Sequence, residues 1–581
     1  MAVVLTVCES DMLYQSQEQN LFLHTQLFFQ QQMVHPGGLL TWMGSYLTQF
    51  FYYPVLGTGL LCLFWALFMF VLQHTFRIPS AWALLPVACL LMTIVNLGYW
   101  IYFLKLHGHL FDATLGSLFA VSMTGAYRCL PRNYVSRLAF LPFAIGIGYV
   151  CFGFYALWGG ALMAVIPFSR NMETTACKKP LTILTALVVL VLIIFVPLGC
   201  YYYCYHETNI ALIYWAALPV YAHNGGAMMT YYLPFIALVL LPLFFIFVKP
   251  RRWVTCGLLL TALMGVIISW HRDANFHHEL KMARSMEQSD WKAVLLEAEK
   301  VKGEPTRAIC TMRNLALFRT GRMGEEMFAA LQGDKRPDAP FNIPLIHTVG
   351  RAIYLQYGLA NYCYRWCMED GVEYGWTVEK LKLMTRCALV NNELAVAQKY
   401  LNLLRKTDFH KDWARRYARY LREPQLLADD AEMQFIIRLK RIDNFLTNDQ
   451  GQVESFLLEH FATAQSSDPL VEELTMMAAL QWKSAPLFWA QFVRYTSLHQ
   501  GQRLPRHYQE AACMFGHLEQ IDMSRMPFDL QVSNDYREMA LTMNQCHQQG
   551  MSIEQMAPHI PAHLRSTYYY YYYFNRTNYS N

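Results

Sequence analysis

Long apolar runs in the first half of the chain constrain its fold more than any other feature. Crossing a bilayer takes about 17–25 apolar residues in a helix. Runs of this kind occur at about residues 55–75, 82–104, 110–126, 181–203, 230–248 and 253–270. A soluble core cannot cover so many long apolar helices, so we expect a polytopic transmembrane helical bundle.

Acidic residues are scarce in the same half of the chain. Residues 1–270 contain six Asp or Glu and eleven Lys or Arg, whereas the remaining residues contain 36 of each sign. The formal net charge of +5 therefore lies in the apolar half, where basic residues of short loops orient membrane spans. This distribution predicts a membrane part followed by a soluble part. The net charge is no argument for nucleic acid, and we expect no nucleic-acid partner.

Four basic loops predict how many times the chain crosses the membrane. They carry Arg77, then Arg128, Arg132 and Arg137, then Arg170, Lys178 and Lys179, then Lys249, Arg251 and Arg252. If all four are cytoplasmic, the apolar stretch 138–169 must cross twice, with a turn near residues 146–149. We therefore expect about eight spans. Residues 209–226 then form an interfacial or re-entrant helix, and a ninth crossing is the alternative.

The first residues do not look like a signal peptide, because no basic region precedes the apolar stretch from Met1 to Cys8. They are typical of the end of a truncated first span. We thus expect three parts: residues 1–54 as the end of that span and an outer loop with an interfacial helix at 20–32, residues 55–271 as the transmembrane domain, and residues 272–581 as a periplasmic helical-repeat domain.

Pairs of amphipathic helices recur in the last part. The clearest pair lies at residues 376–407, where two helices flank an Asn391-Asn392 turn, and weaker pairs lie at 285–331, 346–371 and 471–498. The unit length and the helix pairing resemble tetratricopeptide or Sel1-like repeats. Helix pairs must stack to bury their apolar faces, so an all-α, tetratricopeptide-like solenoid is expected. An irregular helical bundle is the alternative.

The chain ends in a run of tyrosines, Tyr568 to Tyr573, followed by Phe574. Aromatic residues on all sides of one helix favour a segment packed against the preceding helices. A frayed tail is the alternative.

Ionisable residues collect on the predicted outer face. The catalytic candidates are Asp11, Glu9 and Asp112, and the substrate-binding candidates are His24, His107, His109, His206 and Glu207. Ionisable groups near lipid are costly, so such a collection marks a candidate site. Outer loops that are simply longer, and therefore more polar, are the alternative.

The acidic residues suggest two kinds of chemistry. Paired carboxylates can hold a hard divalent cation that bridges a lipid-linked phosphate. One carboxylate can instead act as a base toward an acceptor hydroxyl. A carboxylate that only caps a helix is the alternative for each acid, and no cofactor or metal ligand set is assigned.

The layout of residues 1–270 resembles the type C glycosyltransferase superfamily of polytopic enzymes. Glu9-Ser10-Asp11 corresponds in position to the acidic motif in the first outer loop of that superfamily, which implies a polyprenyl-phosphate-linked sugar donor. The stretch from Gly37-Gly38 to Tyr53-Pro54 resembles uncharacterised inner-membrane proteins of Bacteroidota-type bacteria. That resemblance implies a bacterial inner membrane, with the C-terminal domain in the periplasm.

Two functions follow from different classes. In one, the membrane half transfers a sugar from a lipid carrier, although only Lys105, His206 and Arg272 offer positive charge to the donor phosphate. In the other, the membrane half anchors a helical array that binds a protein partner. A transporter is a weaker third option, because the spans show no internal repeat.

Overall fold

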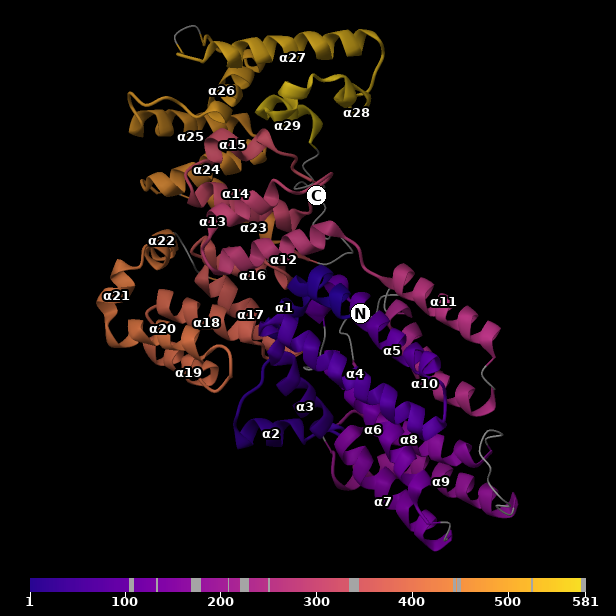
Figure 1. Ribbon diagram of the computed structural model, residues 1–581. Helices are drawn as coiled ribbons and strands as arrows, with labels where there is room; N and C mark the ends of the chain where they lie inside the picture. Colours follow the sequence, from indigo (N-terminus) through magenta and orange to yellow (C-terminus); the bar gives the residue numbers. More distant parts are fainter. Residues whose placement is uncertain are drawn as a thin grey trace. The chain divides into compact units, whose positions relative to one another are not determined.

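The computed structural model describes residues 1–103, 109–131, 134–168, 179–206, 208–219, 229–248, 251–333, 344–441, 446, 451–464, 466–523 and 526–575. The regular secondary structure of these residues is helical throughout, which confirms the all-α prediction for the described part of the chain (Figure 1). Several predicted loop residues lie outside it: Lys105, Arg132, Arg170, Lys178 and Lys249.

Two compact units make up the chain. The first contains Met1–Asp273, Asp370–Lys382 and Lys399–Ala418, and the second contains Ala274–Glu369, Leu383–Gln398 and Arg419–Asn581. Two short segments from the later part of the sequence thus belong to the same unit as the apolar helices.

Each predicted apolar run of the first unit forms a helix. The helices are α1 (Ser10–Glu18), α2 (Gln26–Gln32), α3 (Gly38–Thr48), α4 (Pro54–Phe76), α5 (Ser80–Val95), α6 (His109–Cys129), α7 (Tyr134–Phe152), α8 (Phe154–Val165), α9 (Lys179–Tyr203), α10 (Met229–Phe247) and α11 (Arg252–Ser269). In the described residues, α4, 135–152 of α7, 183–203 of α9 and α11 are long and apolar enough to cross a membrane. Helices α5, α8 and the described part of α10 are apolar but shorter.

Two predicted boundaries are wrong, and glycine explains both. Helix α5 ends at Val95 and not near residue 104, because the chain turns at Gly98 (φ +47°) into a short 3₁₀ helix, Gly98–Phe103. The break in residues 138–169 lies at Gly153 and not at 146–149. Gly153 has φ +55° and ψ −128°, a backbone conformation that residues with a Cβ rarely adopt.

Two expected interfacial segments are only partly helical. Within residues 20–32, only Gln26–Gln32 forms a helix, capped by the Thr25 side chain. Within residues 209–226, Ile210–Trp215 forms a 3₁₀ helix capped by Asn209, and residues 220–228 lie outside the description.

Several helix ends of the first unit meet at one end of the bundle. The Gly37 amide donates to the Val150 carbonyl oxygen at 2.9 Å, and the Phe154 amide donates to the Ala216 carbonyl oxygen at 2.9 Å. The α7–α8 turn, the N-terminal segment and the segment after α9 therefore lie together.

The ends of α5 and α11 are also tied together by hydrogen bonding. The His271 amide donates to the Val95 carbonyl oxygen at 2.9 Å. Helices α4 and α6 run in parallel, because the rings of Phe51 and Phe111 are in contact near their starts, with centroids 5.4 Å apart, and Thr75 lies against Gly125 near their ends. Each helix of this pair thus places its carboxyl end at the same side of the bundle.

The later part of the chain consists of consecutive short helices. They are α12 (Ala274–Glu287), α13 (Trp291–Ala298), α14 (Arg307–Arg319), α15 (Met323–Glu326), α16 (Gly350–Gln356), α17 (Ala360–Tyr374), α18 (Val378–Val390), α19 (Leu394–Leu404), α20 (Lys411–Arg422), α21 (Pro424–Asp429), α22 (Ala431–Lys440), α23 (Val453–Ala462), α24 (Pro469–Gln481), α25 (Ala485–Leu498), α26 (Arg506–Leu518), α27 (Leu530–Gln548), α28 (Ile553–Met556) and α29 (Tyr568–Phe574). Helices α17 to α20 contribute residues to both units.

Neighbouring helices in this part pack in pairs, among them α12 with α13, α23 with α24 and α26 with α27. The predicted turn between α18 and α19 is present, with Asn392 at φ +60°. Asparagine tolerates this conformation better than most residues do. The pairing agrees with a helical array, whereas the tetratricopeptide-like repeat type stays a prediction.

The tyrosine run forms the packed terminal helix that the sequence favours. Tyr568, Tyr569 and Tyr571 are buried on one side of α29. The Tyr568 hydroxyl donates to the Leu480 carbonyl oxygen at 3.0 Å, and the Tyr571 hydroxyl donates to the Gln481 carbonyl oxygen at 3.1 Å. Each buried hydroxyl is thus satisfied, which a frayed tail would not achieve.

We expect Gly153→Ala to destabilise the first unit by about 2–3 kcal/mol, because the new Cβ is strained at this backbone conformation. The Cβ would also lie 2.4 Å from the Ala216 carbonyl oxygen. The matched control is Gly146→Ala in α7, where no atom lies within 4 Å of the added Cβ. Thermal unfolding of the purified chain in detergent measures both. Equal unfolding temperatures for the two variants would contradict the role of Gly153.

Candidate functional site

A buried ion pair joins the N-terminal segment to a helix from the later part of the chain. The Lys382 ammonium of α18 donates to both carboxylate oxygens of Glu18 at 2.9 Å. Both residues are almost inaccessible, with exposed fractions of 3% for Glu18 and 6% for Lys382. Two charges can be buried in this way because each neutralises the other and takes up its hydrogen bonds.

A second polar contact ties the same two segments. His24 Nε2 lies 2.9 Å from both carboxylate oxygens of Asp408, and the Gln49 side-chain amide donates to the same carboxylate at 2.8 Å. The His24 amide also donates to the Lys406 carbonyl oxygen at 3.2 Å. His24, expected to bind substrate, therefore has its imidazole engaged by Asp408.

Aromatic packing completes this junction next to Asp408. The Phe409 ring stacks on Tyr52 with centroids 5.4 Å apart and an interplanar angle of 11°. The rings of Phe50 and Tyr53 meet its other sides edge-on, at 5.6 Å and 5.9 Å. The aromatic residues Phe50, Tyr52 and Tyr53 ahead of α4 thus surround the Phe409 ring. We call the contacts of residues 17–53 with residues 378–382 and 406–410 of the same unit the N-terminal junction.

The first pair of candidate acids lies where α1 begins. Glu9 is buried, and the Trp270 indole N–H donates to its Oε1 at 2.6 Å. Burial raises the pKa of the Glu9 carboxyl to about 7; the Trp270 hydrogen bond opposes this rise, and the nearby Asp11 carboxylate adds to it. Asp11 lies in the first turn of α1, where the helix dipole favours a carboxylate.

The third acid, Asp112, is the least satisfied of the candidates. It lies in the first turn of α6 with an exposed fraction of 1%. Its Oδ1 has no hydrogen-bond partner within the described part of the chain. A buried carboxyl oxygen without a partner costs free energy, and such atoms call for a specific explanation.

The remaining candidates do not form a cluster that the structure describes. His206 is exposed after α9, and His109 opens α6 with its side chain outside the description. His107 and Glu207 lie outside the described residues. Across the described ranges, no group of three or more His, Cys, Asp or Glu side chains is placed to hold a metal ion.

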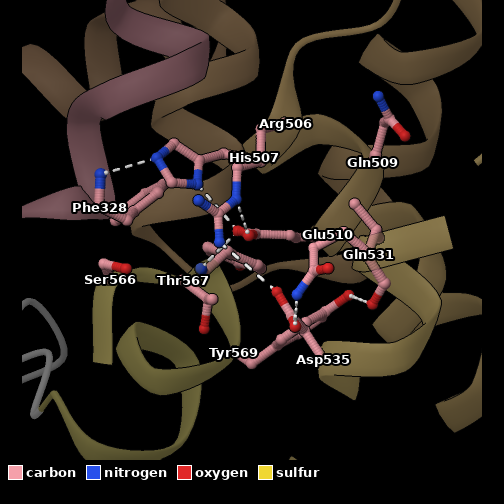
Figure 2. Close-up of polar contacts among 12 residues, drawn as sticks. Phe328, Arg506, His507, Gln509, Glu510, Gln531, Asp535, Ser566, Thr567 and Tyr569 are labelled. Carbon is pink, nitrogen blue, oxygen red and sulfur yellow. Dashed lines mark hydrogen bonds and ion pairs between the residues drawn. The ribbon is translucent and has the colours of Figure 1, made fainter. Parts of the chain in front are cut away.

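The second unit contains a buried polar network centred on α26 (Figure 2). His507 Nδ1 lies 2.8 Å from Glu510 Oε2, and the Arg506 guanidinium donates to Glu510 Oε1 at 2.8 Å. Glu510 also accepts from the Tyr568 amide at 2.7 Å, and Arg506 lies 3.6 Å from Asp535. These contacts join α26 to α27 and α29.

The His507–Glu510 pair has the composition of a catalytic dyad but not its freedom to react. His507 Nε2 accepts the Phe328 backbone N–H at 3.1 Å, so this nitrogen carries no proton and Nδ1 donates to Glu510. Both side chains are fully buried. With both ring nitrogens occupied, the pair holds helices together and cannot act as a base toward a substrate.

Sequence reasoning missed the partners of the N-terminal junction. Lys382, Asp408 and His410 lie more than 350 residues from Glu18, His24 and Gln17, their respective partners. No spacing rule links residues so far apart. The spacing of Arg506, His507 and Glu510 on one helix was a usable signal for the α26 network, because residues three and four apart are neighbours on a helix surface.

Comparison with protein families identifies a match. The model of a protein family described as a family of unknown function matches residues 1–575. No curated protein and no solved structure matches the chain.

We expect Glu9 to make the stability of the first unit depend on pH. Because the pKa of Glu9 is about 7 in the folded chain and 4.5 ordinarily, the folded state keeps a proton that the unfolded state loses. Stability then falls as pH rises from about 4.5 to 7, by at most about 3 kcal/mol.

Glu9→Gln keeps an acceptor for Trp270 and removes the ionisation. The variant should unfold at a higher temperature than the wild type at pH 8 and at a similar temperature at pH 5. Trp270→Phe removes the hydrogen bond that favours the carboxylate, so it should extend the loss of stability to higher pH. A Glu9→Gln variant that keeps the wild-type pH profile would contradict the assignment.

Proposed function

Since this chain belongs to the family of unknown function DUF6057, we propose its function from its own residues: an integral membrane protein that anchors a helical array at the membrane surface. Helices α4 to α11 form eight spans in this proposal, with the basic loops in the cytoplasm. The array lies on the other side, which in a bacterial inner membrane is the periplasm.

Exposed apolar surface supports the membrane placement. In α11, none of the residues of the apolar stretch is buried within the chain. Leu260, Leu263, Met264 and Ile268 are among its exposed side chains. Soluble proteins rarely expose contiguous apolar surface of this extent, whereas lipid covers it without cost.

The arrangement of helix ends supports the proposed sidedness. The N-terminal segment, the α7–α8 turn and the end of α11 lie at one end of the bundle, through the contacts of Gly37, Gly153 and Trp270. The chain that follows α11 then emerges on the same side as residues 1–53. An even number of crossings between these segments accounts for this arrangement.

The N-terminal junction carries the proposal that the membrane half is a platform. Polar residues ahead of α4, among them the candidate His24, are engaged by later segments of the same unit that lead into the array: Glu18 by Lys382, His24 by Asp408, and Gln17 by His410 at 3.0 Å. A junction of buried ion pair, hydrogen bonds and stacked rings suits a fixed mount for a helical array. The array then presents its remaining surface to a protein partner, the common use of such folds.

A second candidate function is transfer of a sugar from a polyprenyl-phosphate carrier at the outer face. The unpartnered Oδ1 of buried Asp112 supports it, because a substrate hydroxyl or a cation would supply the missing partner. Under this reading, Asp112 acts as the base or as a metal ligand, and Glu9 and Asp11 flank the acceptor.

Native cysteines test the membrane topology. Cys129 ends α6 on the proposed cytoplasmic side, Cys204 follows α9 on the outer side, and both are exposed. We expect a membrane-impermeant maleimide to label a single-cysteine Cys204 variant in intact cells, and a Cys129 variant only after the membrane is opened. Equal labelling of the Cys129 and Cys204 variants in intact cells would contradict the eight-span topology.

Charge reversal tests the platform. Lys382→Glu places two carboxylates in the buried pair and should cost about 3–5 kcal/mol in the stability of the junction. Protease access to residues 370–418 in the membrane-bound chain measures this loss. Lys382→Glu combined with Glu18→Lys should restore most of the protection. If Lys382→Glu leaves the segment as protected as in the wild type, the junction does not hold the array.

The Asp112→Asn variant distinguishes the platform hypothesis from the transferase hypothesis. The platform reading expects the variant to support normal cell-surface glycan at normal protein level, because an amide fills the same volume. The transferase reading expects the glycan to be lost.

A further inference from the structure

We infer that the carboxyl ends of α4 and α6 form a binding site for a phosphate group, at the end of the bundle opposite the N-terminal junction. A pocket of about 530 Å³ opens between these two parallel helices. Arg77, His74 and Gln73 line it from α4 and its end, and Arg128 and Ser122 line it from α6. The inference rests on the proposed membrane placement for the source of the ligand but not for the pocket itself.

The pocket carries positive charge that the chain does not balance. Arg77 has no hydrogen-bond or ion-pair partner among the described residues, and Arg128 uses one nitrogen to donate to the carbonyl oxygens of His74 and Thr75. None of the described residues that line the pocket is acidic. Two guanidinium groups facing one space repel each other, and an anion between them removes that repulsion.

A further arginine, Arg137, lies against α6 outside the pocket lining. Arg137 lies over the Tyr127 ring, with its guanidinium carbon 5.7 Å from the ring centroid, close to the end of α6. Its Nε is buried and has no hydrogen-bond partner within the described residues. The local surplus of donors and charge suits an anion with several acceptor oxygens.

The backbone holds Arg77 in an unusual position. Arg77 follows the last residue of α4 with φ +53° and ψ +46°, the left-handed conformation common after helix ends. Glycine or asparagine is the ordinary choice there, and an arginine is strained.

The chemistry of these side chains identifies the ligand class. Arginine forks match the geometry of phosphate oxygens and form charge-assisted hydrogen bonds with them. Gln73 and Ser122 supply neutral hydrogen-bond donors to the same space. The shared chemistry is therefore a phosphate group, carried by a phospholipid headgroup or by a soluble phosphate compound.

Two observations bear on the source of the phosphate. Phe70 lines the pocket with an exposed fraction of 68%, so the pocket opens beside an apolar surface that an acyl chain can cover. In the proposed topology this end lies at the cytoplasmic leaflet, where anionic headgroups attract basic residues. A lipid headgroup thus satisfies both the charge and the apolar rim.

The test uses the full chain in detergent and three probes: phosphatidylglycerol, phosphatidylcholine and inorganic phosphate. We expect native mass spectrometry to show retained phosphatidylglycerol on the wild type, and thermal unfolding to show stabilisation by that lipid. Arg77→Asn suits the left-handed backbone, so the fold is preserved while the charge is lost. Arg77→Asn with Arg128→Gln should weaken phosphatidylglycerol binding at least about tenfold, the effect of losing about 1.4 kcal/mol.

Arg252→Gln is the matched control, because Arg252 is an exposed arginine at the start of α11 and does not line the pocket. It should bind phosphatidylglycerol as the wild type does. Stabilisation by inorganic phosphate that the double variant loses would support the site and assign it to a soluble phosphate compound. Equal binding of phosphatidylglycerol to wild type, double variant and control, or no binding of any probe, would overturn the inference.

These outcomes are separate from those of the proposed function. Failure of the cysteine labelling with phosphate binding retained would overturn the membrane topology alone. Correct labelling with no arginine-dependent binding would overturn the phosphate site alone.

Discussion

Buried charge in the first unit is tolerated where a partner of opposite charge lies beside it. Glu18 and Lys382 are both removed from water, and each is tolerated only because the other lies 2.9 Å away. That pair fixes the end of α1 against α18, and the contacts of Asp408 and Phe409 extend the same junction. Glu18 and His24 of the segment ahead of α4 are thus engaged by residues of the same unit that come from much later in the sequence.

The two ends of the helix bundle differ in how their polar groups are satisfied. At the junction end, carboxylates and imidazoles meet partners from residues 370–418. At the opposite end, Arg77 and Arg128 face a pocket whose described lining contains no acid. One end is thus closed by contacts within the chain, whereas the other keeps positive charge available to a ligand. Asp112 is the exception at the junction end, because its Oδ1 lacks a partner in the described residues.

In the second unit, buried polar groups are satisfied by hydrogen-bond networks between helices. Glu510 accepts from Arg506, His507 and the Tyr568 amide, and the tyrosine hydroxyls of α29 end on carbonyl oxygens. A buried network is favourable only when every member is satisfied. The hydroxyls of Tyr568 and Tyr571 donate to carbonyl oxygens at the end of α24, which phenylalanines could not do.

The sequence by itself determined the helices, because the apolar runs and amphipathic pairs are local patterns read over one or two dozen residues. It located α4, α9 and α11 to within a few residues and indicated the turn at Asn391-Asn392. It misplaced the α7–α8 break, because Gly146, Gly148 and Gly153 look alike in sequence and only packing against Ala216 selects Gly153. Only the tertiary structure decided that His24 pairs with Asp408 and that Glu18 pairs with Lys382. It also decided that Arg77 shares a pocket with Arg128. Such contacts join residues tens to hundreds of positions apart, and no local pattern encodes them.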